Sequence, residues 1–142
     1  MRQMLATGFM HNRVRMVSAS LLIKTLLIDW QEGEKWFAQN LRDYDPAQNN
    51  GGWQWTAGTG ADSQPYYRIF NPWTQGEKYD PKAEYIKKWI PELEEVDPKD
   101  IHKWYDTAFN EEYETIQYTE PIVDYSSQRE EAIKMYKKIE KN

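Results

Sequence analysis

The chain has 142 residues, a formal net charge of −5 and an aromatic content of 15%. This length suits one modest domain and is short for two. Cysteine is absent, which excludes disulfides, thiolate catalysis and sulfur-ligated metals and fits a reducing cytosol. The longest uncharged apolar stretch runs from Met16 to Ile23, far short of the roughly 20 residues that a membrane helix needs. We therefore expect a cytoplasmic protein without a membrane span.

The negative charge lies in the C-terminal half of the chain. Up to Gln75, seven Lys and Arg residues stand against six Asp and Glu, whereas the remainder has eleven against seventeen. The net charge therefore does not exclude a nucleic-acid partner for the first half. Four cations of this half are available for phosphate or carboxylate groups: Arg13, Arg15, Arg42 and Arg68.

Hydrophobic periodicity predicts an almost purely helical chain. The first residues supply barely two turns of helix before Gly8, as though the chain began inside an element, so we expect a fragment of a larger protein. Apolar residues then recur with a helical period over 12–28, which predicts one long buried helix. Asp29 would cap a second helix from about Trp30 to Leu41.

Asp45 and Pro46 predict the start of a third helix, since aspartate accepts the first free amides and proline fits the first helical position. Gly58 and Gly60 would end it. The helix contains "NNGGWQW", in which each glycine costs roughly 0.5–1 kcal/mol relative to alanine. Such a pair indicates a close approach, either by a crossing helix or by a flat ligand, and spacing alone favours the crossing.

Polar residues around this helix are candidates for a binding site. Asp43, Asp45 and Asn49 offer acceptors and an amide to a heterocycle that has ring N–H and carbonyl groups. Asn12 and Met16 share one helix face, four residues apart.

Two arginines and two tryptophans allow more than one interpretation. Arg13 and Arg15 form either a solvated basic edge or contacts with a phosphate and with a carboxylate such as Asp43. Trp30 and Trp53 are most simply core residues, although buried indoles in contact can also relay an electron because indole is easily oxidised.

The remaining chain predicts a loop followed by shorter helices. From Asp62 to Pro81, proline, glycine and asparagine interrupt any period, which indicates an ordered, aromatic-rich loop. Helices are expected at about Lys82 to Ile90 and Lys99 to Thr107. A last helix would follow Ser127, whose side chain fits a capping box with Glu130.

Four long motifs resemble one known family. In chain order they read "TGFMHNRVRM", "LLIDWQEGEKWF", "DYDPAQNNGGWQWTAGTGADSQPYYRIFNP" and "EYIKKWIPEL". From Met1 to about Val123 they resemble the C-terminal half of the flavin-binding catalytic domain of the DNA photolyase/cryptochrome family. This resemblance implies an all-α fold in which residues 1–142 are the C-terminal portion of the FAD-binding domain. The N-terminal antenna domain and the first part of the catalytic domain would then be absent.

The resemblance also implies roles for individual residues. Trp53 and Trp30 match the flavin-proximal and middle tryptophans of a photoreduction chain, and Asn49 faces flavin N5. Gly51 and Gly52 would keep their helix thin where it meets the flavin. The implied cofactor contacts are Asn12, Arg15, Asp43, Asp45 and Asn49. The implied contacts with DNA or with the damaged bases are Asn12, Arg13, Met16, Trp55 and Arg68.

The implied reaction is light-driven repair of pyrimidine dimers. Excited, anionic reduced FAD donates an electron to a flipped-out dimer, the ring bonds break and the electron returns, so neither an acid, a base nor a metal is required. The protein supplies positioning and electrostatics. The full-length protein is expected to be a monomer that binds ultraviolet-damaged DNA, with an antenna chromophore in the absent N-terminal domain.

Residues at a few positions favour one subtype of the family over the others. Relatives that repair the (6-4) photoproduct carry histidines where this chain has Asn12 and Met16, and cryptochromes usually replace the amide of Asn49. DASH-type relatives commonly have Tyr at the position of Trp55. The best match is a cyclobutane pyrimidine dimer photolyase, and the alternative is a cryptochrome-type blue-light photosensor without repair activity. A flavin-free structural or sugar-binding helical module is a third interpretation.

An incomplete domain has consequences for activity. The missing stretch would supply half of the pocket wall, so we expect the isolated chain to bind FAD weakly and to repair little. The missing N-terminal half is accordingly a candidate partner.

Overall fold

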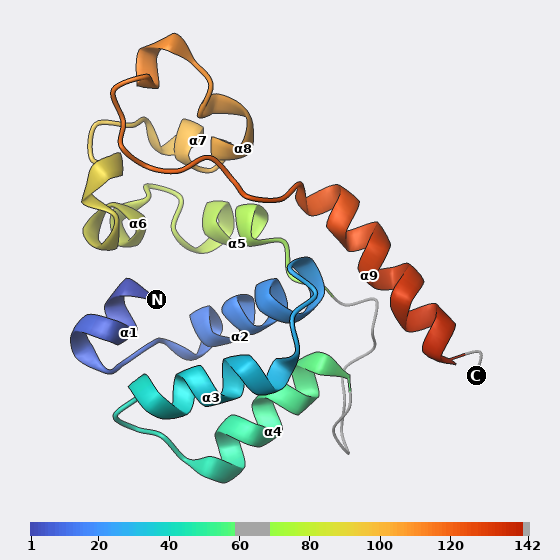
Figure 1. Ribbon diagram of the computed structural model, residues 1–142. Helices are drawn as coiled ribbons and strands as arrows, with labels where there is room; N and C mark the ends of the chain where they lie inside the picture. Colours follow the sequence, from blue (N-terminus) through green and yellow to red (C-terminus); the bar gives the residue numbers. More distant parts are fainter. Residues whose placement is uncertain (59–68, 141–142) are drawn as a thin grey trace. The chain divides into compact units, whose positions relative to one another are not determined.

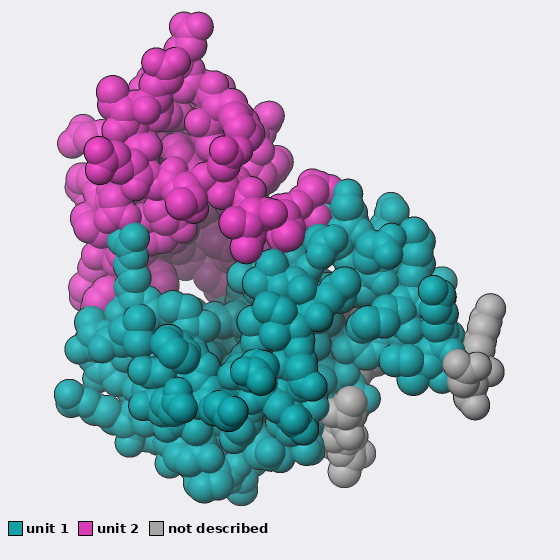
Figure 2. Space-filling view, in the orientation of Figure 1, with its two compact units in different colours: residues 1–70, 125–142 teal, residues 71–124 magenta. Residues whose placement is uncertain are grey.

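The computed structural model describes residues 1–58 and 69–140, and these form helices and connections without any strand. The all-α expectation is thus confirmed for this part of the chain. The chain divides into two compact units: unit 1 combines Met1–Phe70 with Tyr125–Asn142, and unit 2 is Asn71–Asp124 (Figure 2). Within the described residues, no helix is long and apolar enough to cross a membrane.

In the part of unit 1 that the structure describes there are five α-helices and one π-helical turn, with α2, α3 and α4 side by side (Figure 1). The predicted start signals hold, because the side chains of Asp29 and Asp45 accept backbone N–H groups at the starts of α3 and α4. The stop signals at Gly8 and Gly58 hold as well, since both adopt left-handed backbone angles, and Gly60 lies outside the described residues. The elements are α1 (Arg2–Thr7), α2 (Asn12–Ser20), η1 (Leu21–Thr25), α3 (Trp30–Asn40), α4 (Pro46–Ala57) and α9 (Tyr125–Glu140).

The predicted long helix over 12–28 is wrong in its second half. After Ser20 the ladder widens to the π-turn η1, where the N–H of Leu26 donates to the carbonyl oxygen of Leu21 at 2.8 Å. Leu27 then takes a left-handed φ of 56° and ends the element. The turn η1 packs against α9. A helical period of apolar residues therefore does not distinguish an α-helix from this wider turn.

The core of unit 1 lies between its helices and includes residues from α1 to α4. Phe37 and Trp53 meet edge to face, with ring centroids 4.9 Å apart. The buried apolar residues are Met4, Met10, Ala19, Ile23, Phe37, Leu41, Trp53 and Ala57.

The glycine that allows a close helix crossing is Gly33. A Cβ atom there would lie closer than 3.0 Å to the ring of Trp53, whereas Cβ atoms at Gly51 or Gly52 would meet nothing within 4 Å. The interpretation that Gly51 and Gly52 mediate a helix crossing is therefore wrong. Only the structure distinguishes these glycines, since the ring that crosses α3 comes from a residue 20 positions later.

The C-terminal helix α9 belongs to unit 1. Gln128 donates to the carbonyl oxygen of Thr25 at 2.8 Å, and the Tyr136 hydroxyl donates to that of Ala57 at 3.0 Å. The helix begins at Tyr125, so Ser127 lies inside its first turn and is not the cap that the predicted capping box requires.

Unit 2 contains a helix that the sequence reading missed. The prediction of a loop over 62–81 is wrong for the helix α5, where the side chain of Asn71 accepts the N–H of Trp73. Residues 62–68 of that prediction lie outside the described residues. The helix expected over 99–107 is two short helices separated at His102 and Lys103. The elements are α5 (Pro72–Tyr79), α6 (Glu84–Trp89), η2 (Pro91–Leu93), α7 (Pro98–Ile101), α8 (Trp104–Thr107) and η3 (Glu111–Tyr113).

Unit 2 encloses a small core of its own around Trp104, which is 3% exposed. The indole N–H of Trp104 donates to the carbonyl oxygen of Thr119 at 3.1 Å. The Tyr113 hydroxyl donates to a carboxylate oxygen of Asp100 at 2.5 Å, and this bond raises the pKa of Tyr113 to about 12. These bonds satisfy the side-chain polar atoms of Trp104 and Tyr113, which the core buries.

Candidate functional site

A pocket of about 270 Å³ opens in unit 1 and is lined by residues of α2, α3, α4 and the α3–α4 connection. Among the predicted site residues, Trp30 and Arg13 do not line it, and Arg68 lies outside the described residues. Eight others do line it: Asn12, Arg15, Met16, Asp43, Asp45, Asn49, Trp53 and Trp55.

The predicted pair of Arg15 and Asp43 is present. Nη2 of Arg15 donates to both carboxylate oxygens of Asp43, at 3.0 and 2.9 Å, and Nε donates to the carbonyl oxygen of Met10 at 2.6 Å. The guanidinium is thus held from two sides and ties α2 to the α3–α4 connection. Because Asp43 is half exposed, the pair contributes more to geometry than to stability.

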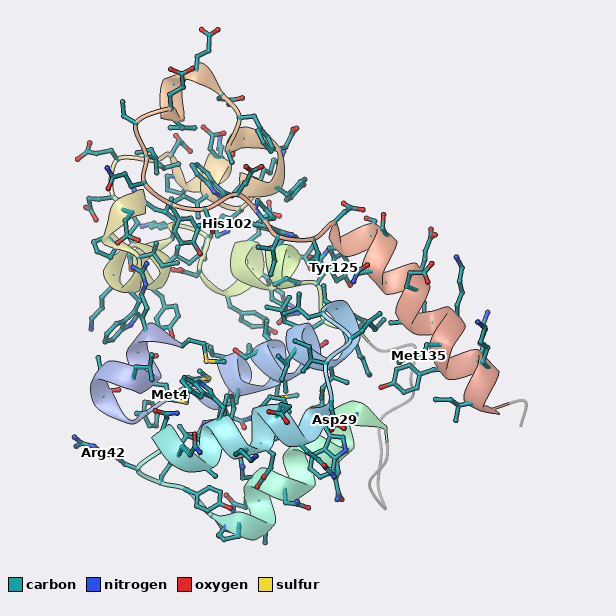
Figure 3. The ribbon with its side chains drawn as sticks, viewed as in Figure 1. Met4, Asp29, Arg42, His102, Tyr125 and Met135 are labelled. Carbon is teal, nitrogen blue, oxygen red and sulfur yellow. The ribbon has the colours of Figure 1, made fainter. Side chains whose placement is uncertain are left out.

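Arg42, the neighbouring cation, does not line the pocket. Its backbone N–H donates to the carbonyl oxygen of Gly8 at 2.8 Å, and its side chain covers the α-carbon of that glycine. From there it projects outward from the α3–α4 connection (Figure 3). The position of Arg42 is therefore explained by its packing against Gly8 at the end of α1.

Asn49 is oriented by a residue that sequence reasoning missed. Its amide nitrogen donates to the backbone carbonyl of Glu34 at 2.9 Å and to the Glu34 carboxylate at 3.2 Å. With its N–H groups engaged on α3, Asn49 offers its carbonyl oxygen as the group for a ligand. No local signal points to Glu34, because its partner lies 15 residues later in the sequence.

Tyr44 is a second missed residue of the pocket wall. Partial desolvation, followed by the negative charge of Glu34, raises the pKa of the Tyr44 phenol. The phenol therefore stays neutral at physiological pH. It adds a neutral hydroxyl to the pocket wall beside Asp43 and Asp45.

Asp45 acts first on the backbone of α4. Its Oδ1 accepts from the N–H groups of Ala47 at 2.9 Å and Gln48 at 3.1 Å. Among the described residues no hydrogen bond engages Oδ2, so this oxygen is the atom that Asp45 can offer to a ligand. One carboxylate oxygen of Asp45 thus caps α4, and the other is available at the pocket wall.

Asn12 and Met16 lie together on α2, as their spacing predicts. The amide nitrogen of Asn12 is 3.7 Å from the sulfur of Met16, a weak hydrogen bond. His11 begins the helix by accepting the N–H of Arg13 on its Nδ1 at 3.2 Å. The amide of Asn12 thus sits on the first turn of α2, where it lines the pocket.

Aromatic rings and a glycine form the apolar part of the pocket. Trp53 is 3% exposed and packs on Phe37, and Trp55 contributes a second indole. Gly52 lines the pocket as well, and the space in front of its α-carbon is open. This position of Gly52 agrees with the alternative interpretation, in which the glycine leaves room for a ligand.

The arrangement suits a flat heteroaromatic molecule. Acceptors from Asp45 and Asn49 can meet ring N–H groups, an ion pair bounds the rim, and indole rings provide a large apolar contact. The open space at Gly52 would let such a ring approach the backbone of α4. The residues present therefore fit the isoalloxazine ring of FAD.

Known proteins resemble the chain over nearly its whole length. A family described as the FAD binding domain of DNA photolyase matches residues 1–138. A deoxyribodipyrimidine photo-lyase of Halobacterium salinarum is 51% identical over 139 residues, which are 97% of this chain and 29% of that protein. The crystal structure of a class III photolyase from Agrobacterium tumefaciens matches with a TM-score of 0.91 and 47% identity, over 99% of this chain and 30% of that one.

A second functional class is similar in structure too. A cryptochrome of Synechocystis matches with a TM-score of 0.85 and 39% identity, over 94% of this chain and 29% of its own. The chain thus spans 29% to 30% of the length of these relatives.

Proposed function

The chain belongs to the DNA photolyase family through its FAD-binding domain, and we propose that it is part of a larger enzyme that repairs cyclobutane pyrimidine dimers by light-driven electron transfer. One observation carries this proposal: eight residues that the family resemblance implicates line a single pocket in unit 1. FAD, when bound, would supply the light-excited electron donor.

The polar residues of the pocket would hold and orient the ring. The carbonyl oxygen of Asn49, kept in place by Glu34, would accept a ring N–H, and Oδ2 of Asp45 would accept another. The pair of Arg15 and Asp43 would place a charge dipole beside the ring without a net charge. In this assignment the protein positions the cofactor and transfers no proton of its own.

A second group of residues would receive the damaged bases. Trp55 provides an indole face for a flipped-out dimer, and Asn12 with Met16 contributes an amide and a thioether beside it. Arg13 would contact the DNA backbone, where its charge meets a phosphate. The role that the resemblance assigns to Arg68 is the same.

Two tryptophans would return the cofactor to its reduced state. Trp53 lines the pocket and would give the first electron, and Trp30 packs against the same core and would refill Trp53. This relay would serve a photosensor equally well. The similarity to a cryptochrome is the observation that keeps the photosensor without repair activity as the second candidate.

A chimera tests the function. The matching 139 residues of the Halobacterium photo-lyase would be replaced by this chain, and the product assayed for FAD content and for dimer repair in ultraviolet-damaged DNA under blue light. We expect bound FAD and repair above a dark control. Bound FAD that photoreduces without repair would favour the photosensor, and a colourless, folded chimera would contradict both assignments.

The isolated chain tests the expectation of weak binding. After incubation with excess FAD and gel filtration, little flavin should co-elute, because the 142 residues span only 29% to 30% of the length of the flavin-binding relatives. Repair by the isolated chain at the rate of the chimera would contradict this expectation.

A further inference from the structure

Gly33 is a crowded position between α3 and α4. It is buried, and a Cβ atom added to it would overlap Cη2 and Cζ3 of Trp53 and would lie 2.7 Å from Cδ2 of Leu22. Real Cβ atoms essentially never approach other atoms closer than 3.0 Å. The outer edge of the Trp53 indole therefore rests on the backbone of α3, which a residue with any side chain would prevent.

The neighbours of Gly33 on α3 show what this contact achieves. Trp30 and Phe37 are three residues before and four after Gly33, so all three share one face of the helix. Phe37 packs edge to face on Trp53, and Trp30 packs against the same core. The indole of Trp53 thus reaches the helix face that carries Trp30, one turn away, which is about 5 Å along the axis.

We propose that Gly33 is a positioning residue for electron transfer from Trp30 to Trp53, an inference that rests on the proposed function. One electron leaves Trp53 for light-excited FAD, which is thereby reduced, and Trp53 becomes a radical cation. One electron then passes from Trp30 to Trp53, so that Trp53 is neutral again and Trp30 is oxidised. A dissolved thiol restores Trp30 with one further electron.

The physical reason lies in the distance dependence of electron transfer. Electronic coupling through protein decreases steeply as the separation of donor and acceptor grows. A methyl group at position 33 would push the indole of Trp53 off α3, away from Trp30 or further into the pocket. Either shift would weaken the relay while every redox-active side chain is still present.

The first test measures the contact itself and needs no flavin. Urea unfolding of the whole chain is followed for Gly33→Ala, Trp53→Phe and the double variant. In an uncrowded helix Gly→Ala is stabilising, whereas here we expect G33A to lower the folding equilibrium constant at least tenfold. Phe lacks the outer ring that meets position 33, so the double variant should recover at least tenfold over the product of the single effects.

The second test measures the relay in the flavin-loaded chimera described above. At saturating FAD and with a thiol reductant, G33A should slow photoreduction per bound flavin at least tenfold. Lys35→Ala, an exposed change two residues along α3, should leave both the folding constant and the photoreduction rate unchanged.

The outcomes separate this inference from the proposed function. Photoreduction by G33A at the rate of the unsubstituted chimera would overturn the positioning role. Additive effects in the unfolding cycle would overturn the contact. If G33A alone fails to fold, a double variant that folds supports the contact and one that also fails to fold overturns it. A chimera that binds FAD but never photoreduces would overturn the proposed relay, whatever the unfolding cycle shows.

Discussion

In unit 1, Asp45 uses one carboxylate oxygen to cap α4 and keeps the other at the pocket, whereas in unit 2 both oxygens of Asp80 accept backbone N–H groups, from Tyr85 and Ile86. The same contrast appears in the aromatic residues. Trp53 is a core residue that also lines a pocket, while Trp104 gives its N–H to Thr119 and is enclosed. In unit 1 the carboxylate of Asp45 and the indole of Trp53 thus serve both the fold and the pocket, whereas Asp80 and Trp104 serve only the fold of unit 2.

Truncating the central tryptophan of each unit should separate stability from binding. Trp53→Ala and Trp104→Ala should each cost about 3–5 kcal/mol, since both remove a buried indole. Only Trp53→Ala should also abolish FAD binding in the chimera, measured by flavin fluorescence titration. Equal losses of FAD affinity in two folded variants would break the contrast between the units.

Alkaline pH should change stability in opposite directions through Lys24 of unit 1 and Tyr113 of unit 2. Burial lowers the pKa of Lys24 from 10.5 to about 8, so unit 1 gains stability as the pH rises from 8 to 10.5 and the unfolded chain loses the proton it still holds. The pKa of Tyr113 is raised from 10.0 to about 12, so its contribution to unit 2 is present below pH 10 and is lost as the pH approaches 12.

Urea unfolding from pH 7 to 12 checks both slopes, with one variant for each group. Lys24→Met should remove the gain between pH 8 and 10.5, and Tyr113→Phe should reduce the loss above pH 10. A gain that persists in Lys24→Met would show that another group is responsible for the response of unit 1.

The helix caps allow a smaller, matched comparison. Asp45 caps α4 in unit 1 and Asp97 caps α7 in unit 2 by the same kind of bond. Replacement of either by Ala should cost about 1 kcal/mol, whereas FAD affinity of the chimera should fall only for Asp45→Ala. Thermal unfolding and FAD titration are the measurements, and unchanged affinity in Asp45→Ala would contradict its assignment to the cofactor.

The glycine pair of α4 should give the smallest effects. Gly51→Ala and Gly52→Ala each meet no atom within 4 Å, so each should stabilise the chain by about 0.5–1 kcal/mol through helix propensity. Gly52→Ala should weaken FAD binding in the chimera because Gly52 lines the pocket, and Gly51→Ala should weaken it less. Equal weakening by both would show that the ring lies across both positions.

The sequence by itself determined the features whose cause is local. Asp29 and Asp45 start their helices, and Gly8 and Gly58 end theirs, because a cap depends on residues within about four positions. The long family motifs also identified most of the residues that line the pocket, including Asn49 and its neighbours. The start of α5 also depends on neighbouring residues, because Asn71 and Pro72 form a regular helix-start signal. The other proline, glycine and asparagine residues nearby made this segment resemble a loop.

Only the tertiary structure decided which residues act on one another across helices. Gly33, Glu34 and the widened turn η1 owe their roles to Trp53, Asn49 and α9. Their partners lie 15 or more residues away, and no short-range pattern encodes such a distance. Side-chain volume explains the contrast between the glycines of α3 and α4: the sequence contains all three, but only the packing of an indole on α3 prevents Gly33 from carrying a Cβ atom, whereas Gly51 and Gly52 face open space.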